Sequence, residues 1–213
     1  MNLRHWIFAK LYDRLLKKAE QDWLAEKRRE LLAMASGRVI EIGGGTGANL
    51  PHYRDVQEVV LTEPHQEMMA EAGAKLSQAQ VPVTLHKAPA ESLPFADGAF
   101  DTAVATLVFC TVADLEKALF EIHRVLSPQG RLLFIEHIRG SGRRARWQDR
   151  LTPVWSFVAL GCHLNRETVA AIERSGFRLE AVRYHEPDAL PRISRPLVSG
   201  LAVKIAAAGE LQS

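Results

Sequence analysis

The amino-acid sequence predicts an α/β protein with a doubly wound, mostly parallel β-sheet and helices on both faces. Two observations lead to this fold class. From residue 38 onward, short aliphatic runs alternate with segments of helical periodicity, and such alternation is typical of right-handed βαβ units. A glycine-rich turn at 43–47 follows the first run, at the carboxyl edge where parallel sheets bind their ligands.

Each element of the predicted sheet follows from a local pattern. Seven runs rich in aliphatic or β-branched residues are predicted as strands: 38–42, 58–62, 81–86, 100–107, 131–138, 177–184 and 197–203. Helical segments are expected around 48–53 and over 66–78, 113–126 and 165–175. Asn165 is expected to cap the last helix and Gly176 to end it. A Pro-Gln-Gly turn at 128–130 precedes the fifth strand.

Residues 1–36 precede this pattern and are predicted to form a helical extension. Apolar residues recur at helical spacing from Leu3 to Ala33, with lysines and arginines between them. The extension is expected to pack on the edge of the domain or to close over a site as a lid. As a basic amphipathic helix, it is alternatively suited to peripheral contact with an anionic membrane. Residues 37–213 are predicted to be a single domain with an insertion at about 139–165.

Charge and cysteine content exclude several classes of protein. The chain has 27 basic and 25 acidic residues, and this balance argues against a nucleic-acid-binding protein. The charges are segregated, because residues 39–138 hold six basic and 13 acidic residues and both flanking segments are basic. Two cysteines are too few for a disulfide scaffold. The sequence shows neither a signal peptide nor a membrane span, so we expect a cytoplasmic protein.

The strongest local signal is the run Glu41-Ile42-Gly43-Gly44-Gly45-Thr46-Gly47 after the first strand. Glycines there let the backbone turn sharply and approach a ligand closely. Glu63 ends the second strand, and an acid at that point accepts hydrogen bonds from the ribose of NAD or of any adenosine cofactor. The turn alone does not separate these cofactors, because Gly43, Gly45 and Ala48 also satisfy the dinucleotide pattern G-x-G-x-x-G/A.

Sequence blocks further along the chain distinguish between these cofactors. The glycine run and Glu63-Pro64 are followed by Ala90-Glu91-x-Leu93-Pro94-Phe95 and by Glu121-x-x-Arg124-Val125-Leu126-x-Pro128-x-Gly130. Together these blocks resemble the class I S-adenosylmethionine-dependent methyltransferases, in particular their methyltransferase type 11 domain. The resemblance implies a Rossmann-like seven-stranded sheet with S-adenosyl-L-methionine as the cofactor.

The resemblance also implies which residues bind the cofactor. The glycine turn would hold the methionine moiety and Glu63 the ribose hydroxyls. Pro89 stands where many relatives have an aspartate that contacts adenine, so this contact would pass to Glu91 or to the backbone of Ala90. The complete expected set is Glu41, Gly43, Gly44, Gly45, Gly47, Glu63, Pro64, Ala90, Glu91, Thr106 and Leu107.

The second half of the chain resembles one group within this family more closely. The blocks are Thr106-Leu107-Val108-x-Cys110, Glu136-His137, Trp147-Gln148-x-x-Leu151-x-Pro153-x-Trp155 and Gly161-Cys162-x-Leu164-x-Arg166-Glu167. They are similar to blocks of the methyltransferase-like thiol S-methyltransferases and of bacterial phospholipid N-methyltransferase-like proteins. The resemblance implies methyl transfer to a small molecule, with a thiol as first choice and a phospholipid or small amine as the alternative. From other classes, an NAD-dependent oxidoreductase and a non-catalytic cofactor-binding module stay open.

Two histidines are candidate bases for the proton of the acceptor. His137 ends the fifth strand, where the site should open, and His163 lies in the block 161–166. A neutral imidazole accepts a proton near pH 7. Glu136 is expected to point away from the site, because neighbours on a strand face opposite sides.

The remaining conspicuous side chains receive structural interpretations. Trp147 and Trp155 lie eight residues apart and are expected on one helical face, either as core or as the lining of an acceptor pocket. Cys110 and Cys162 are expected to be small buried hydrophobes. Methyl transfer needs no metal and none is predicted, and the oligomeric state stays open.

Overall fold

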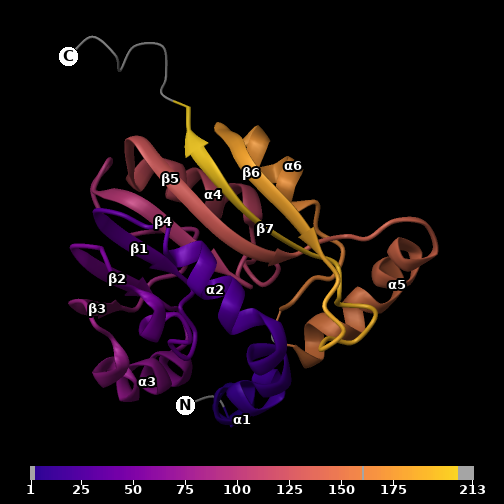
Figure 1. Cartoon of the computed structure of the whole chain (residues 1–213). Coiled ribbons are helices and arrows are strands. Elements are labelled where there is room, and N and C mark those ends of the chain that lie inside the picture. The colour runs from indigo at the N-terminus through magenta and orange to yellow at the C-terminus, as the bar shows by residue number, and fades with distance from the viewer. Residues whose placement is uncertain (1–2, 160, 206–213) are drawn as a thin grey trace.

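A computed structural model of the chain describes residues 3–159 and 161–205. One sheet contains seven strands in the order β3-β2-β1-β4-β5-β7-β6 (Figure 1). The strands are β1 (Arg38–Ile42), β2 (Glu58–Thr62), β3 (Val83–His86), β4 (Phe100–Thr106), β5 (Leu126–His137), β6 (Phe177–His185) and β7 (Leu197–Lys204). Neighbouring strands among β1 to β5 are parallel, whereas β7 is antiparallel to both β5 and β6. The predicted fold class is confirmed.

Helices cover both faces of the sheet (Figure 1). In chain order they are α1 (Leu3–Ala19), α2 (Ala25–Leu32), α3 (Gln66–Ala74), α4 (Leu115–Val125), α5 (Gly142–Val158) and α6 (Thr168–Arg174). A short π-helical segment, Glu20–Leu24, joins α1 to α2, so the extension is one continuous helical run. Within residues 3–159 and 161–205, no helix is long and apolar enough to cross a membrane.

The two faces of the sheet bury separate parts of the core. On one face, Leu31 of α2 packs in a cluster that contains Leu133 of β5. On the other face, Ile122 of α4 and Ile172 of α6 share a cluster with Phe134. Adjacent residues of β5 therefore enter different clusters, as strand alternation requires. This two-sided cover leaves the strand ends as the edges at which a site can form.

Two predictions about helices are wrong. Residues 48–53 do not form an α-helix but turns that lead into a 3₁₀ helix at Leu50–His52. Pro51, which has no backbone N–H, sits in its first turn. Asn165 does not cap α6, which begins at Thr168 after Glu167. The Asn165 side chain instead donates a hydrogen bond to Asp149 of α5.

The predicted turn at 128–130 interrupts the fifth strand instead of preceding it. Phe100 of β4 pairs with Leu126, and the next pair joins Thr102 to Arg131. The residues between Leu126 and Arg131 therefore bulge out of the sheet. This bulge lies at the amino end of β4, far along the strand from the glycine turn.

Candidate cofactor and acceptor site

The glycine turn leaves β1 at the carboxyl edge of the sheet and exposes its backbone. Gly43 and Gly45 have φ angles of 57° and 56°, a region that glycine enters without steric cost. The N–H of Gly44 donates to the carbonyl of Thr62 on β2 at 2.9 Å. A Cβ added to Gly45 would meet nothing nearer than Met68 Cε at 3.5 Å, whereas one on Gly43 would lie 2.8 Å from Val108. The backbone at Gly45 is therefore open to a ligand.

Glu63 brings a buried carboxylate to this turn. It follows β2 and is only 5% exposed. Its Oε2 accepts a hydrogen bond from the Gly45 N–H at 3.1 Å, and its Oε1 accepts one from the His65 N–H at 2.9 Å. The His65 ring lies against the same oxygen, and this contact raises the pKa of His65. Pro64 between them is exposed.

Glu41 lies beneath the turn in a buried hydrogen-bond network. Its carboxylate accepts from the Asn49 side-chain amide at 3.0 Å and from the Tyr53 hydroxyl at 2.8 Å. The Asn49 amide nitrogen also lies 3.1 Å from the Thr106 hydroxyl, and Arg28 of α2 donates to the Asn49 carbonyl oxygen. Burial raises the pKa of Glu41 to about 7. The network joins the glycine turn, the end of β4 and the N-terminal extension.

The first helix lies against the same turn. Asp13 of α1 accepts a hydrogen bond from the Thr46 hydroxyl at 2.6 Å and pairs with Lys75 after α3. Lys10 pairs with Glu71 of α3. These contacts hold α1 across the glycine turn and α3. Four residues of this network were not predicted from the sequence, because no local spacing indicates contacts between such distant segments. They are Asp13, Arg28, Asn49 and Tyr53.

Glu136 holds the loop that follows β4. Its Oε1 accepts hydrogen bonds from the backbone N–H groups of Val108 at 2.7 Å and Phe109 at 2.9 Å. The loop starts at Leu107, which has a φ of 59°. Glu136 is fully buried, and burial raises its pKa to about 8. The prediction that Glu136 points away from the site misses this role, because its carboxylate shapes the loop beside Thr106.

The segment after α5 packs onto the same loop. The His163 N–H donates to the Cys110 carbonyl at 2.7 Å, and the Arg166 guanidinium donates to the carbonyls of Phe109 and Val112. Cys110 and Cys162 are buried in one cluster, as the sequence predicts. The structure therefore brings the end of the predicted insertion against the end of β4.

The two candidate bases have different surroundings. His137 is half-buried, its Nδ1 has no hydrogen-bond partner among the described residues, and the backbone of Ser194 lies against its ring. Burial lowers the pKa of His137 to about 4, so its ring is neutral at pH 7. His163 Nδ1 lies 3.3 Å from the Cys110 carbonyl oxygen. Both histidines border the carboxyl ends of β4 and β5.

The residues expected at the adenine lie beyond β3. Ala90 is buried. The Glu91 carboxylate accepts hydrogen bonds from the N–H groups of Ala113 at 2.8 Å and Asp114 at 3.2 Å, where α4 begins. Its place near an adenine edge stays a prediction.

Trp147 and Trp155 do not share a face of α5, contrary to expectation. Trp147 is 55% exposed, with the Arg150 guanidinium 5.9 Å from its ring centre. Trp155 is partly buried against Cys110 and Cys162. Eight residues advance an α-helix by a little more than two turns, so the two rings diverge. Trp155 packs against the body of the molecule, whereas α5 as a whole lies at one side of it (Figure 1).

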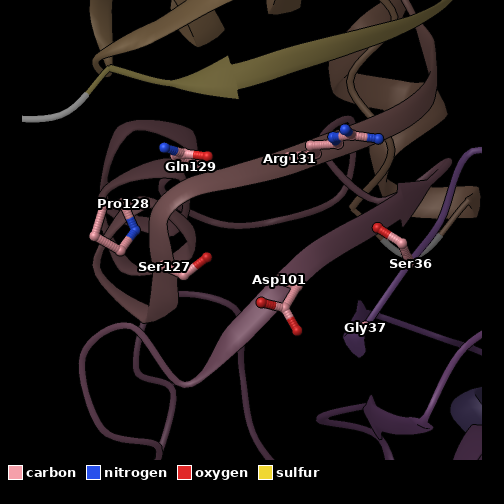
Figure 2. Close-up of a pocket in the computed structure, with 7 residues that line it drawn as sticks. All are labelled: Ser36, Gly37, Asp101, Ser127, Pro128, Gln129 and Arg131. Carbon is pink, nitrogen blue, oxygen red and sulfur yellow. The ribbon is translucent and has the colours of Figure 1, made fainter.

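A cavity of about 490 Å³ lies at the opposite edge of the sheet (Figure 2). It is lined by Ser36, Gly37, Asp101, Ser127, Pro128, Gln129 and Arg131. These residues begin β1, β4 and the regular part of β5, so they lie at the amino ends of the strands. The cavity is separate from the glycine turn. Among the described residues, no three metal-binding side chains gather into a metal site.

Comparison with known proteins relates both halves of the chain to enzymes. A family model described as a methyltransferase domain matches residues 40–134. Human thiol S-methyltransferase TMT1A is 31% identical over 96% of this chain and 90% of its own length. Demethylmenaquinone methyltransferase from Thermus thermophilus is 36% identical, but over 59% of this chain and 59% of its own length.

The fold also matches solved structures. A SAM-dependent methyltransferase from Thermotoga maritima, described as a possible histamine N-methyltransferase, has a TM-score of 0.70 at 22% identity. The match covers 96% of this chain and all of that one. At this coverage, both this match and the match to the human enzyme extend over most of the N-terminal helices and over the segment around α5.

Proposed function

The chain belongs to the S-adenosylmethionine-dependent methyltransferases, and from this premise we propose that its methyl acceptor is a small thiol. One observation carries the choice of acceptor. The human thiol S-methyltransferase matches 96% of the chain, and so includes most of the N-terminal helices and the segment around α5. The quinone-methylating relative matches 59%, too little to include both ends. The match to the thiol S-methyltransferase over the N-terminal helices and the segment around α5, where we expect the acceptor to bind, therefore favours a thiol.

We infer that the cofactor lies across the carboxyl ends of β1, β2 and β4. The open Cβ position at Gly45 leaves room for a ligand to pass close to the backbone of the turn. The Glu63 carboxylate has free lone pairs for ribose hydroxyls. The cofactor supplies an electrophilic methyl group on a positively charged sulfur, and the buried carboxylate of Glu63 gives this edge the complementary charge.

Transfer to sulfur requires the acceptor thiol to lose its proton. A thiolate is a far stronger nucleophile than a thiol, and an ordinary thiol has a pKa of about 8.5. Neutral His137, with an unpartnered Nδ1, is suited to accept a hydrogen bond from an S–H group. The protein then has to hold sulfur and methyl group at about 3–3.5 Å and exclude water.

Replacing His137 by glutamine is expected to lower kcat by about 100-fold, the lower range for loss of a proton acceptor, while the affinity for S-adenosylhomocysteine stays unchanged. His163→Gln serves as the matched control and should retain most activity. Because the pKa of His137 is about 4, its ring is neutral throughout the neutral range, and the wild-type rate should be flat there, with no inflection near pH 6.5. An inflection near 6.5 would contradict a base with the low pKa of His137, and full activity of His137→Gln would transfer the role to His163 or to no protein base.

The acceptor class is tested with the purified chain and methyl-labelled S-adenosylmethionine. A panel of small alkyl and aryl thiols, small amines and phosphatidylethanolamine vesicles is offered as acceptors, and labelled products are identified by mass spectrometry. Methylated thiols as the main products support the proposal. Transfer to amines or phospholipid with none to thiols would replace it by the N-methyltransferase alternative, and binding of S-adenosylhomocysteine without any transfer would favour a non-catalytic module.

We propose a cytoplasmic location with peripheral contact to membranes through α1. Ile7, Leu11 and Leu15 recur every four residues on this helix and are exposed, and Arg14 and Lys17 on the same helix are exposed as well. Such a face is typical of helices that lie on anionic lipid. Fractionation of cells that express the chain, before and after a high-salt wash, tests the location. Retention of the whole protein in the soluble fraction at low salt contradicts membrane contact.

A further inference from the structure

Two cysteines from distant parts of the chain lie in one buried cluster next to the carboxyl end of β4. Cys110 lies in the loop after β4, and Cys162 lies four residues after the end of α5. They are 1% and 8% exposed, respectively, and share a cluster with Leu164 and the partly buried Trp155. Both are free thiols. The mechanism proposed above uses neither of them.

The backbones that carry the two thiols are held together by hydrogen bonds. The His163 N–H donates to the carbonyl of Cys110 at 2.7 Å, and Arg166 donates to the carbonyls on either side, those of Phe109 and Val112. A Cβ on Gly161 would lie 3.1 Å from the Thr111 carbonyl oxygen, which shows how closely the two segments approach. The two side chains lie in the same buried cluster across this contact, and the Cys110 thiol donates to the carbonyl of Leu107 at 3.6 Å.

The two sulfur atoms have unequal surroundings. The neighbouring Cys110 thiol lowers the pKa of Cys162, and the Arg166 guanidinium acts in the same direction. The same contact and complete burial raise the pKa of Cys110. Cys162 is also the more exposed of the two. Cys162 therefore has the features of an attacking thiolate, and Cys110 those of the resolving thiol.

We propose that Cys110 and Cys162 are an oxidation site at which a peroxide forms an intrachain disulfide that lowers methyl transfer. The Cys162 thiolate attacks one oxygen of hydrogen peroxide and becomes a sulfenic acid, with release of hydroxide. The Cys110 sulfur then attacks the sulfenic sulfur, a disulfide bond forms, and water leaves with the Cys110 proton. The two thiols lose two electrons in total, and the peroxide is reduced to two equivalents of water.

Oxidation would change the wall of the site. A disulfide requires an S–S distance of about 2.05 Å, which is shorter than any non-bonded contact between two sulfur atoms. The loop 107–112, which Glu136 supports, and the segment 161–166 would have to move toward each other. Tyr12 of α1 is half-buried, and the electrostatic influence of both cysteines contributes to its raised pKa, although desolvation is the main cause. The disulfide therefore forms where α1, the β4 loop and the post-α5 segment meet.

The full-length chain is treated with hydrogen peroxide, and free thiols are alkylated after denaturation and counted by mass spectrometry. We expect both thiols to disappear, a Cys110–Cys162 cross-linked peptide to form within the monomer, and dithiothreitol to restore both thiols. The formation of this cross-link does not depend on the identity of the acceptor. Retention of both thiols, or oxidation of Cys162 to sulfinic acid without a cross-link, overturns the proposal.

The consequence for turnover rests on the proposed function and is measured separately. A displacement of about 1 Å in a positioning segment costs on the order of 100-fold in rate, so oxidised wild type should lose that much and regain it with dithiothreitol. Cys110→Ser and Cys162→Ser, each compared with its own untreated sample, should show no reversible loss. Cross-linking with unchanged methyl transfer would overturn the effect on turnover, whereas absence of any transfer before oxidation would contradict the proposed function alone.

Discussion

Replacing Gly45 by valine is expected to weaken binding of S-adenosylhomocysteine by on the order of 100-fold, the equivalent of two lost hydrogen bonds to a charged ligand group at roughly 1.5 kcal/mol each. The Cβ position of Gly45 is open, with Met68 Cε at 3.5 Å. A branched side chain there would occupy the space through which the ligand reaches the backbone. Isothermal titration calorimetry measures the change.

The matched control for this variant is Gly98→Val. Gly98 also has a positive φ, 67°, and a Cβ there would meet nothing nearer than 3.9 Å, but it precedes β4 at the opposite edge of the sheet. Both variants carry the strain of a left-handed valine, of order 1–3 kcal/mol, and only Gly45→Val should lose the ligand. Gly43 is unsuitable, because its Cβ would lie 2.8 Å from Val108. Equal affinity in Gly45→Val and wild type would show that this turn does not hold the cofactor.

Replacing Glu136 by alanine is expected to lower the free energy of unfolding by about 3 kcal/mol, because the N–H groups of Val108 and Phe109 lose their buried acceptor at roughly 1–3 kcal/mol each. The loop they belong to borders the site, so kcat should fall as well. Glu136→Gln keeps a carbonyl oxygen at the position of the acceptor and should recover much of both losses. Urea denaturation measures stability, and a loss below about 0.5 kcal/mol in Glu136→Ala, typical of a surface substitution, would contradict this role.

Glu136 also gives stability a pH dependence of defined sign. Its pKa is raised from 4.5 in the unfolded chain to about 8 in the folded one, so the folded state holds a proton that the unfolded state releases between these values. The free energy of unfolding therefore falls as pH rises through this interval. Glu136→Gln removes this contribution, and Glu41, with its pKa raised to about 7, retains a smaller slope in the same direction. An identical pH slope in wild type and Glu136→Gln would contradict the assignment.

Local patterns predicted the framework of the site for a physical reason. In parallel strands, residues at the same register lie side by side, and Ile42 of β1 pairs with Thr62 of β2. Glu63 therefore had to reach the glycine turn once both runs were identified as strands. A helix cap is harder to predict, because a polar side chain can bond to a distant residue instead of the adjacent helix. Asn165 does so: its side chain donates to Asp149 of α5 and does not cap α6.

By itself, the sequence determined the order of the seven strands along the chain and placed the glycine turn and Glu63 at the carboxyl edge of the sheet, where it predicts the cofactor. These features follow from the local order of residues, because strand patterns and glycine turns depend on neighbours in the chain. Only the tertiary structure decided that Asp13 and Arg28 reach the turn, that Glu136 supports the β4 loop, and that Cys110 meets Cys162. Each of these contacts joins segments far apart in the chain, and their meeting depends on how helices pack across the sheet.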